Sequence, residues 1–155
     1  MSDLEEMHQR RKAREVALQV LYELDVLDID AEEAIAIFWN YFGAAEECKK
    51  FSTLIIKGTC DKIEEIDSLI SSCSDNWSLA RMSRVDRNIL RMAVYELLYC
   101  SDIPPKVTLN EAIDLGKLYG SENSGSFING ILDAVYLKLY KEEANQTING
   151  ISGSS

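Results

Sequence analysis

The sequence is poor in the two residues that interrupt helices. Only 2 of its 155 residues are proline and 8 are glycine, and the prolines are adjacent, at Pro104 and Pro105. This scarcity argues against a fold of many short strands, because such folds need frequent turn residues. Apolar residues make up 46% of the chain, which is enough for one buried core. The composition therefore favours a single helical domain.

Residues and motifs for catalysis and metal binding are also scarce. His8 is the only histidine, and the four cysteines (Cys48, Cys60, Cys73 and Cys100) form no CxxC pair, whereas zinc sites use closely spaced Cys and His ligands. The motifs GxxxxGK(S/T), GxGxxG, GxSxG and HExxH are missing, which removes the common nucleotide-binding, hydrolase and metalloprotease signatures. We therefore expect no enzyme, no cofactor and no metal, with the cysteines as free thiols.

Long apolar runs are missing as well. No window approaches the ~18 consecutive apolar residues of a membrane span. The first fourteen residues are highly charged and lack the apolar centre of a signal peptide. We expect a soluble cytoplasmic protein with no membrane contact.

Helical spacing of apolar residues covers almost the whole chain and predicts an all-α fold. Residues 13 to 24 place an apolar stripe on one face of a first helix. Further helices are predicted over 31–42, from 46 to about 70, over 83–99, from 108 to 119 and over 127–139, with a short turn or helix at 78–82. The 83–99 segment is apolar over more than half its circumference, so we expect it at the centre. We assign residues 1–143 to one domain and 144–155 to a flexible polar tail.

Two local features refine this expectation. Thr108 and Glu111 fit a capping box, which would start the helix at residue 108. Gly116 lies inside that helix, and the close approach of another helix backbone would explain it. Gly120 should end the helix.

The charge is acidic overall but unevenly distributed. The net charge is −10, yet residues 9–14 and 81–91 together hold 8 of the 16 lysines and arginines. Residues 23–47 carry eight acidic side chains and no basic one. An acidic molecule with concentrated basic charge can bind a polyanion at one face only. The alternative is that the arginines are merely solvated on helix surfaces.

The first helix carries the main candidate site. Arg10, Arg11 and Arg14 are placed within one turn, opposite the apolar stripe, with Lys12 nearby. Arginine pairs with phosphates through its planar fork. Gln19 and Tyr22 lie two or three turns further on, and a tyrosine ring offers a flat surface to an unpaired base. The alternative for Tyr22 is a place at the edge of the core. The hypothesis requires the guanidinium groups not to be bound in internal ion pairs.

A loop at residues 119–127 is the second candidate. Tyr119 and Phe127 flank a polar segment that contains Asn123 and Ser126. Its amides and hydroxyls suit the edges of bases, although Phe127 is more typical of a core residue.

Three blocks of the sequence resemble the NusB family. The first is RRKAREVALQVLYELD at residues 10–25, and the second is NWSLARMSRVDRNILRMAVYELLY at 76–99. The third comprises DIPPKVTLNEAIDLGKLYG at 102–120 and FINGILD at 127–133. The blocks occur in the family's order. The resemblance implies about seven helices in two packed three-helix subdomains.

The resemblance also implies a function. NusB-type proteins bind boxA RNA of nascent ribosomal transcripts together with the ribosomal protein NusE, and help RNA polymerase to resist termination. The implied RNA-binding residues are Arg10, Arg11, Lys12, Arg14, Gln19, Tyr22, Tyr119, Asn123 and Phe127. The polar side of the central helix is implied to face NusE, through Asp86, Arg87, Arg91, Tyr95 and Glu96.

The chain departs from the family's pattern at two positions of the loop. Ser126 stands where a lysine is frequent, and Asn123 where an acid is frequent. Two other functions stay open: a protein-interaction adaptor that docks an acidic partner, and the RNA-binding module of a ribosomal RNA methyltransferase. We expect the second least, because 155 residues leave no room for a catalytic domain. A homodimer is also open, since some family members pair through the RNA-binding face.

Overall fold

The computed structural model describes residues 2–42, 46–75 and 77–153, and all the regular structure in these ranges is helical. This confirms the all-α prediction. In chain order the elements are α1 (Asp3–Val26), α2 (Ala31–Phe42), α3 (Glu46–Asp61), α4 (Ile63–Ser72), the short 3-10 helix η1 (Leu79–Arg81), α5 (Arg84–Tyr99), α6 (Pro105–Tyr119) and α7 (Ser124–Gly153).

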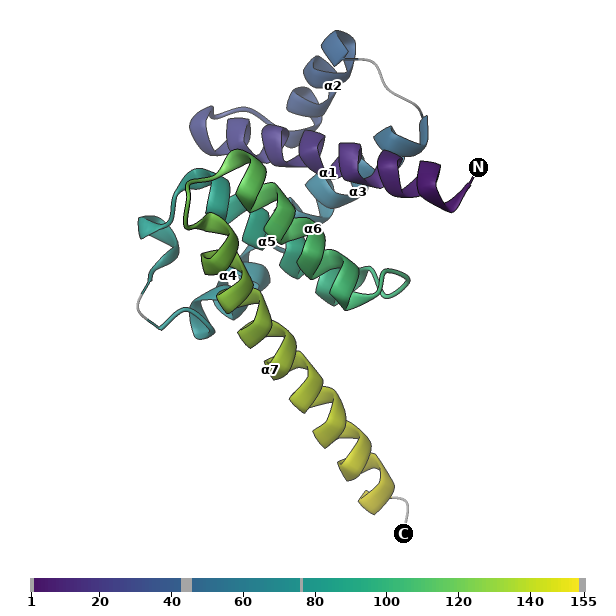
Figure 1. The fold of residues 1–155 in the computed structure, drawn as a ribbon, viewed down its shortest axis with the longest axis vertical. Helices are drawn as coiled ribbons and strands as arrows, with labels where there is room; N and C mark the ends of the chain where they lie inside the picture. The colour runs from purple at the N-terminus through teal and green to yellow at the C-terminus, as the bar shows by residue number, and fades with distance from the viewer. Residues whose placement is uncertain (1, 43–45, 76, 154–155) are drawn as a thin grey trace.

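The helices form two groups that meet along α5. Helices α1, α2 and α3 pack together, as do α5, α6 and α7 (Figure 1). Helix α4 lies against α5, and α1 also packs on α5, so that α5 touches both groups. The expected pair of three-helix subdomains and the central place of the 83–99 helix are both confirmed.

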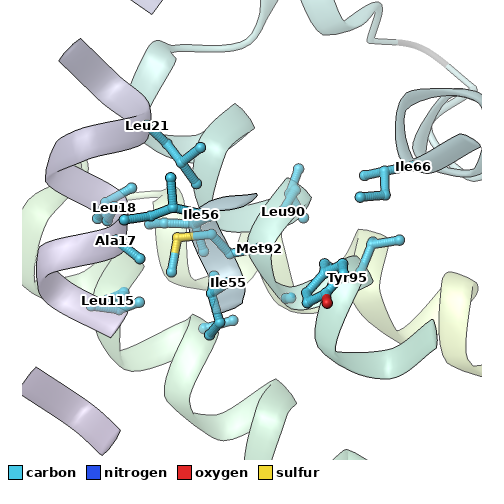
Figure 2. Close-up of a cluster of buried hydrophobic side chains, with 14 of the residues drawn as sticks. Ala17, Leu18, Leu21, Ile55, Ile56, Ile66, Leu90, Met92, Tyr95 and Leu115 are labelled. Atoms are coloured by element: carbon cyan, nitrogen blue, oxygen red, sulfur yellow. The ribbon is translucent and has the colours of Figure 1, made fainter. Parts of the chain in front are cut away.

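The core is built where the two groups meet. Side chains of α1, α3, α5 and α6 come together there (Figure 2), and Ile55, Ile56 and Leu90 are fully buried. On α1 the buried residues occupy more of the circumference than one stripe, because the helix packs on α3 along one side and on α5 along another. This double packing determines which arginines of α1 are buried and which reach solvent.

Two glycines allow helices to approach closely. A Cβ on Gly58 of α3 would lie 2.1 Å from the ring of Tyr95 on α5. A Cβ on Gly116 of α6 would lie 2.6 Å from Ile128 and 3.4 Å from the backbone of Ser124 on α7. The close approach predicted for Gly116 is therefore confirmed.

Four predicted boundaries are confirmed or corrected by the structure. The helix predicted from residue 83 begins at Arg84, where Ser83 caps it by accepting a hydrogen bond from the backbone amide of Asp86, and Gly120 ends α6, as expected. The predicted capping box is wrong, because α6 begins at Pro105, whose fixed φ suits the first helical turn. Thr108 is consequently buried inside the helix. The predicted long third helix is broken at Lys62 into α3 and α4.

The C-terminal segment differs from the expected loose tail. Helix α7 is 30 residues long, and its C-terminal part extends away from the other helices (Figure 1). Residues 144–153, expected to lack structure, belong to this helix. The division into a domain of residues 1–143 and a separate tail stays a prediction.

Candidate nucleic-acid interface

Arg14 is a core residue and does not lie on the surface. Its residue exposure is 3%, and positions 14, 18 and 21 share a face, so Arg14 continues the line of the buried Leu18 and Leu21. Its Nε and Nη2 donate to the buried carboxylate of Glu96 on α5 at 3.0 and 2.7 Å. Thr108 of α6 donates to the same carboxylate at 3.2 Å. The prediction that Arg14 lies opposite the apolar stripe is wrong, and its guanidinium is not available to RNA.

Arg11 and Arg10 reach solvent but are also paired. Arg11 donates to Glu111 of α6 at 3.1 Å and to Asp114 at 3.3 Å, with 48% of its side chain exposed. Its hydrogen bond with Glu111, reinforced by the carboxylate charge, raises the pKa of Arg11. Arg10 lies 3.6 Å from both Glu6 and Asp102. The condition that these guanidinium groups be free of internal ion pairs is therefore not met. Because their charges are already balanced, the arginines attract phosphate less than the sequence suggested, and any RNA site must depend on other residues.

The remaining predicted residues of α1 line a groove. Lys12, Gln19 and Tyr22 lie along one face of the helix, and Tyr119 at the end of α6 joins them. The groove has a volume of about 550 Å³, which is within the range of small-molecule sites. The structure thus brings together four residues that are separated by up to 107 positions in the sequence.

The groove combines aromatic and hydrogen-bonding groups. Tyr22 is 36% exposed and Tyr119 is 47% exposed, so neither is a buried core residue. Burial, together with the carboxylate of Glu15, raises the pKa of the Tyr119 phenol. Among the described residues Lys12 has no ion-pair partner, in contrast to Arg10, Arg11 and Arg14. Stacking surfaces beside an unpaired cation are typical of single-stranded RNA sites.

Sequence reasoning missed Trp39 as a groove residue. Trp39 and Phe38 of α2 line the groove, their rings meeting edge to face at 5.9 Å. The Lys49 ammonium lies 5.7 Å from the centroid of the Trp39 ring. In the sequence, Trp39 belongs to the apolar pattern of its helix and is indistinguishable from core. A charged residue ten positions later gave no signal that it would lie over this ring.

Of the predicted residues of the 119–127 loop, Tyr119 lines the groove, but Asn123 and Phe127 do not. Asn123 is exposed just before α7, and its backbone carbonyl accepts from the amide of Phe127. Phe127 is partly buried and meets the exposed Trp77 edge to face, with ring centroids 6.0 Å apart. Its packing favours the core interpretation of Phe127 that the sequence left open. The RNA-binding roles of Asn123 and Phe127 stay predictions.

The polar side of α5 is mostly turned inward, contrary to the expectation of a partner-facing surface. Asp86, Tyr95 and Glu96 are 9%, 7% and 3% exposed. Tyr95 packs against α3 at Gly58, and Glu96 holds Arg14.

Arg87 and Arg91 of α5 are bound to carboxylates of other helices. Arg87 donates to Asp25 of α1 at 3.1 Å, and Arg91 donates to Asp67 of α4 at 2.8 Å. Their side chains are 15% and 12% exposed. The second basic stretch of the sequence therefore supplies internal ion pairs rather than an open basic surface.

The described part of the chain holds no group of histidine, cysteine and acidic side chains suited to a metal ion. All four cysteines are free thiols, as predicted. Burial raises the pKa of Cys100 to about 11, so its nucleophilic thiolate is scarce at neutral pH. Within the same described residues, no helix is both long and apolar enough to cross a membrane.

Comparison with known proteins identifies the family. The model of the NusB family matches residues 11–137. The transcription antitermination protein NusB of Syntrophus aciditrophicus is 61% identical over 142 residues, covering 92% of this chain and 88% of the relative.

Two solved structures resemble the fold. T. maritima NusB matches with a TM-score of 0.75 and 41% identity, over 81% of this chain and 89% of that one. A chain from a crystal structure of the antitermination factors NusB and NusE in complex with dsRNA matches with a TM-score of 0.79 and 30% identity, over 85% and 98%. With its two helical groups and its sequence in agreement, the chain belongs to the NusB family.

Proposed function

We propose that the protein is an RNA-binding transcription antitermination factor. It binds single-stranded boxA-type RNA of nascent ribosomal transcripts together with NusE, within the antitermination complex of RNA polymerase. Support comes from the relative named transcription antitermination protein and from the related NusB and NusE structure in complex with dsRNA. The role requires binding only, so the protein acts without catalysis or cofactor, in the cytoplasm where bacterial transcripts are made.

The observation that carries the proposal is the groove along α1. Tyr22, Trp39 and Tyr119 come from three different helices and meet there beside Lys12 and Gln19. Aromatic rings bind bases by stacking only when the bases are unpaired and can be splayed out. The groove therefore favours a single strand over a duplex as the RNA ligand.

The groove also explains how an acidic protein can bind RNA. The net charge of −10 repels phosphates in general. Lys12, which unlike Arg11 has no ion-pair partner among the described residues, supplies positive charge on the exposed flank of α1. An RNA strand would bind along this flank and avoid the rest of the surface.

For NusE, we retain Arg87 and Arg91 as the contact candidates on α5. Asp86, Tyr95 and Glu96 are too buried to contact a partner directly. The two arginines keep part of their side chains at the surface, and Arg87 also donates to the backbone of Leu79, which ties η1 to α5.

A binding titration tests the proposal. We would measure the fluorescence anisotropy of a boxA-like RNA and of a scrambled strand, each with and without purified NusE. The proposal expects tighter binding of the boxA-like strand, strengthened further by NusE. Equal affinity for both strands in both conditions would reject it, and binding of NusE alone would instead indicate a protein adaptor. Elution mass at several concentrations tests for the homodimer.

A further inference from the structure

The inside of the groove carries negative charge. Positions 12, 15, 19 and 23 are spaced to share one face of α1, and all four line the groove. They supply the carboxylates of Glu15 and Glu23 against the single ammonium of Lys12, the one basic residue among the described residues of the lining. A phosphate group is repelled by two carboxylates. If RNA occupies the groove, it must insert something other than its backbone.

The walls of the groove suit a flat, uncharged group. Tyr22, Trp39 and Tyr119 present aromatic rings from α1, α2 and α6. Positive charge lies beside the groove instead, since the Lys49 ammonium is placed over the Trp39 ring. A nucleobase between the rings, with its phosphates outside near the lysines, matches both the shape and the charge.

The two carboxylates have different environments. Glu15 interacts with the phenol of Tyr119 and, second to burial, contributes to its raised pKa. The carboxylate of Glu23 has no hydrogen-bond or ion-pair partner among the described residues, whereas its backbone carbonyl accepts from the amide of Leu27. It lies one turn from the amide of Gln19, on the same face of the helix. Glu23 is therefore the acceptor that is available to a ligand.

A carboxylate accepts hydrogen bonds and donates none, so it selects bases with N–H groups on the exposed edge. Guanine offers an imino N–H beside an amino group, an arrangement that matches both oxygens of one carboxylate. Cytosine and adenine offer one amino group. Uracil offers a single N–H between two carbonyl oxygens, and those oxygens would face the carboxylate unfavourably.

We propose that the groove between α1, α2 and α6 binds one unpaired nucleobase of the RNA, and that Glu23 makes it select guanine over uracil. The base stacks on Trp39, Tyr22 and Tyr119, while Gln19 completes the contact with its edge. This inference rests on the proposed RNA-binding function and adds to it a specific pocket and its preferred base.

The test uses Trp39 as its own reporter. The chain contains two tryptophans, and Trp77→Phe leaves Trp39 alone while keeping an aromatic ring against Phe127. In this background we would titrate a strand of eleven uridines and the same strand with one central guanosine, and follow tryptophan fluorescence. We expect the guanosine strand to bind about tenfold more tightly, as one well-made bidentate contact discriminates bases, and to quench Trp39.

The Glu23→Gln variant gives the decisive comparison. It should reduce the preference for guanosine to within about twofold, because the acceptor pair is lost, while the all-uridine strand binds at least as well as before. Glu33→Gln is the matched control, since Glu33 is exposed on α2, does not line the groove, and loses the same charge. It should keep the full preference.

The outcomes separate this inference from the proposed function. Equal, salt-dependent binding of both strands would overturn the base pocket and leave RNA binding intact. A preference that survives Glu23→Gln unchanged would overturn the role of Glu23. A Trp39 signal that depends on protein concentration without RNA would show a second copy in the groove and overturn the pocket. Failure to bind either strand, or boxA-like RNA with NusE, would overturn the proposed function itself.

Discussion

Two faces of α1 carry polar residues, and they differ in whether those residues are paired with acidic side chains. The arginines at positions 10, 11 and 14 lie on the side next to α5 and α6 and are paired with acids there. Lys12, Gln19 and Tyr22 lie on the side of the groove, where Lys12 has no ion-pair partner among the described residues. The lesson is that the density of basic residues does not locate a binding surface. The location of their acidic partners does.

The largest expected effect concerns the buried pair. Arg14→Met should lower the free energy of unfolding by about 3–5 kcal/mol, because it leaves the buried Glu96 charge without its partner. The double variant with Glu96→Leu should recover much of this loss and bind RNA like the parent, since the groove is unchanged. Urea unfolding and RNA titration measure the two properties. A stable Arg14→Met variant that has lost RNA binding would contradict our assignment of Arg14 to the core.

The next effect concerns the groove itself. Tyr22→Ala should weaken the binding of single-stranded RNA about tenfold or more, because stacking on an aromatic ring contributes roughly 1–3 kcal/mol per base. The melting temperature should fall somewhat, since Tyr22 is only 36% exposed and its buried part loses packing, so the affinity is measured at a temperature where the variant is fully folded. Tyr140→Ala is the control, because Tyr140 is 59% exposed on α7 and does not line the groove. Equal loss in both variants would show that the groove is not the site.

The error about Arg14 shows why sequence alone could not separate these two faces. A helical wheel finds the stripe of residues 13, 16, 17, 20, 21 and 24, and this stripe is indeed buried or partly buried. It does not reveal that α1 packs against a second helix, α5, which buries position 14 as well. The acid that makes this possible, Glu96, is 82 positions away. An ion pair at that separation leaves no local pattern.

Other features of the fold could be predicted from the sequence where neighbouring residues in the chain determine them. The central place of α5 follows from its own apolar circumference, which the sequence shows directly. The break at Lys62 has no proline, glycine or side-chain cap to announce it. Trp39 is a groove residue only because α2 is placed beside α1 and α6. Its role depends on tertiary packing, which a pattern of twelve residues does not contain.

A smaller effect compares two basic residues on the same helix. Lys12→Ala should reduce the slope of log affinity against log salt by about 0.7, the contribution of one phosphate contact with a single strand. Arg11→Ala should reduce it less, because Arg11 is held by Glu111 and Asp114. Titrations at several salt concentrations decide the order. A larger change for Arg11 than for Lys12 would mean that RNA displaces the internal carboxylates and that the two faces act together.

The smallest effect tests whether Arg87 and Arg91 of α5, like Arg14, are held in ion pairs within the protein. Burial acts to raise the pKa of Asp25, but hydrogen bonds from Asn88 and Arg87 outweigh it and lower that pKa below its ordinary value of 3.8. A carboxyl group with a lowered pKa in the folded state stabilises the protein above its ordinary pKa, and this contribution is lost as the pH falls through the folded-state pKa. At neutral pH, Asp25→Asn should therefore lower the free energy of unfolding by about 1 kcal/mol, a modest value because the site is partly solvated.

The difference between the parent and Asp25→Asn should shrink when unfolding is measured at increasing acidity below pH 4, because the parent then loses the charge that the variant never had. RNA affinity at neutral pH should be unchanged, since Asp25 does not line the groove. A difference that stays constant with pH would mean that the ionised carboxylate is not what binds Arg87. An increase in RNA affinity would mean that breaking the pair releases Arg87 to the transcript. The α5 arginines would then contact RNA, as proposed for Lys12, and would not be purely structural like Arg14.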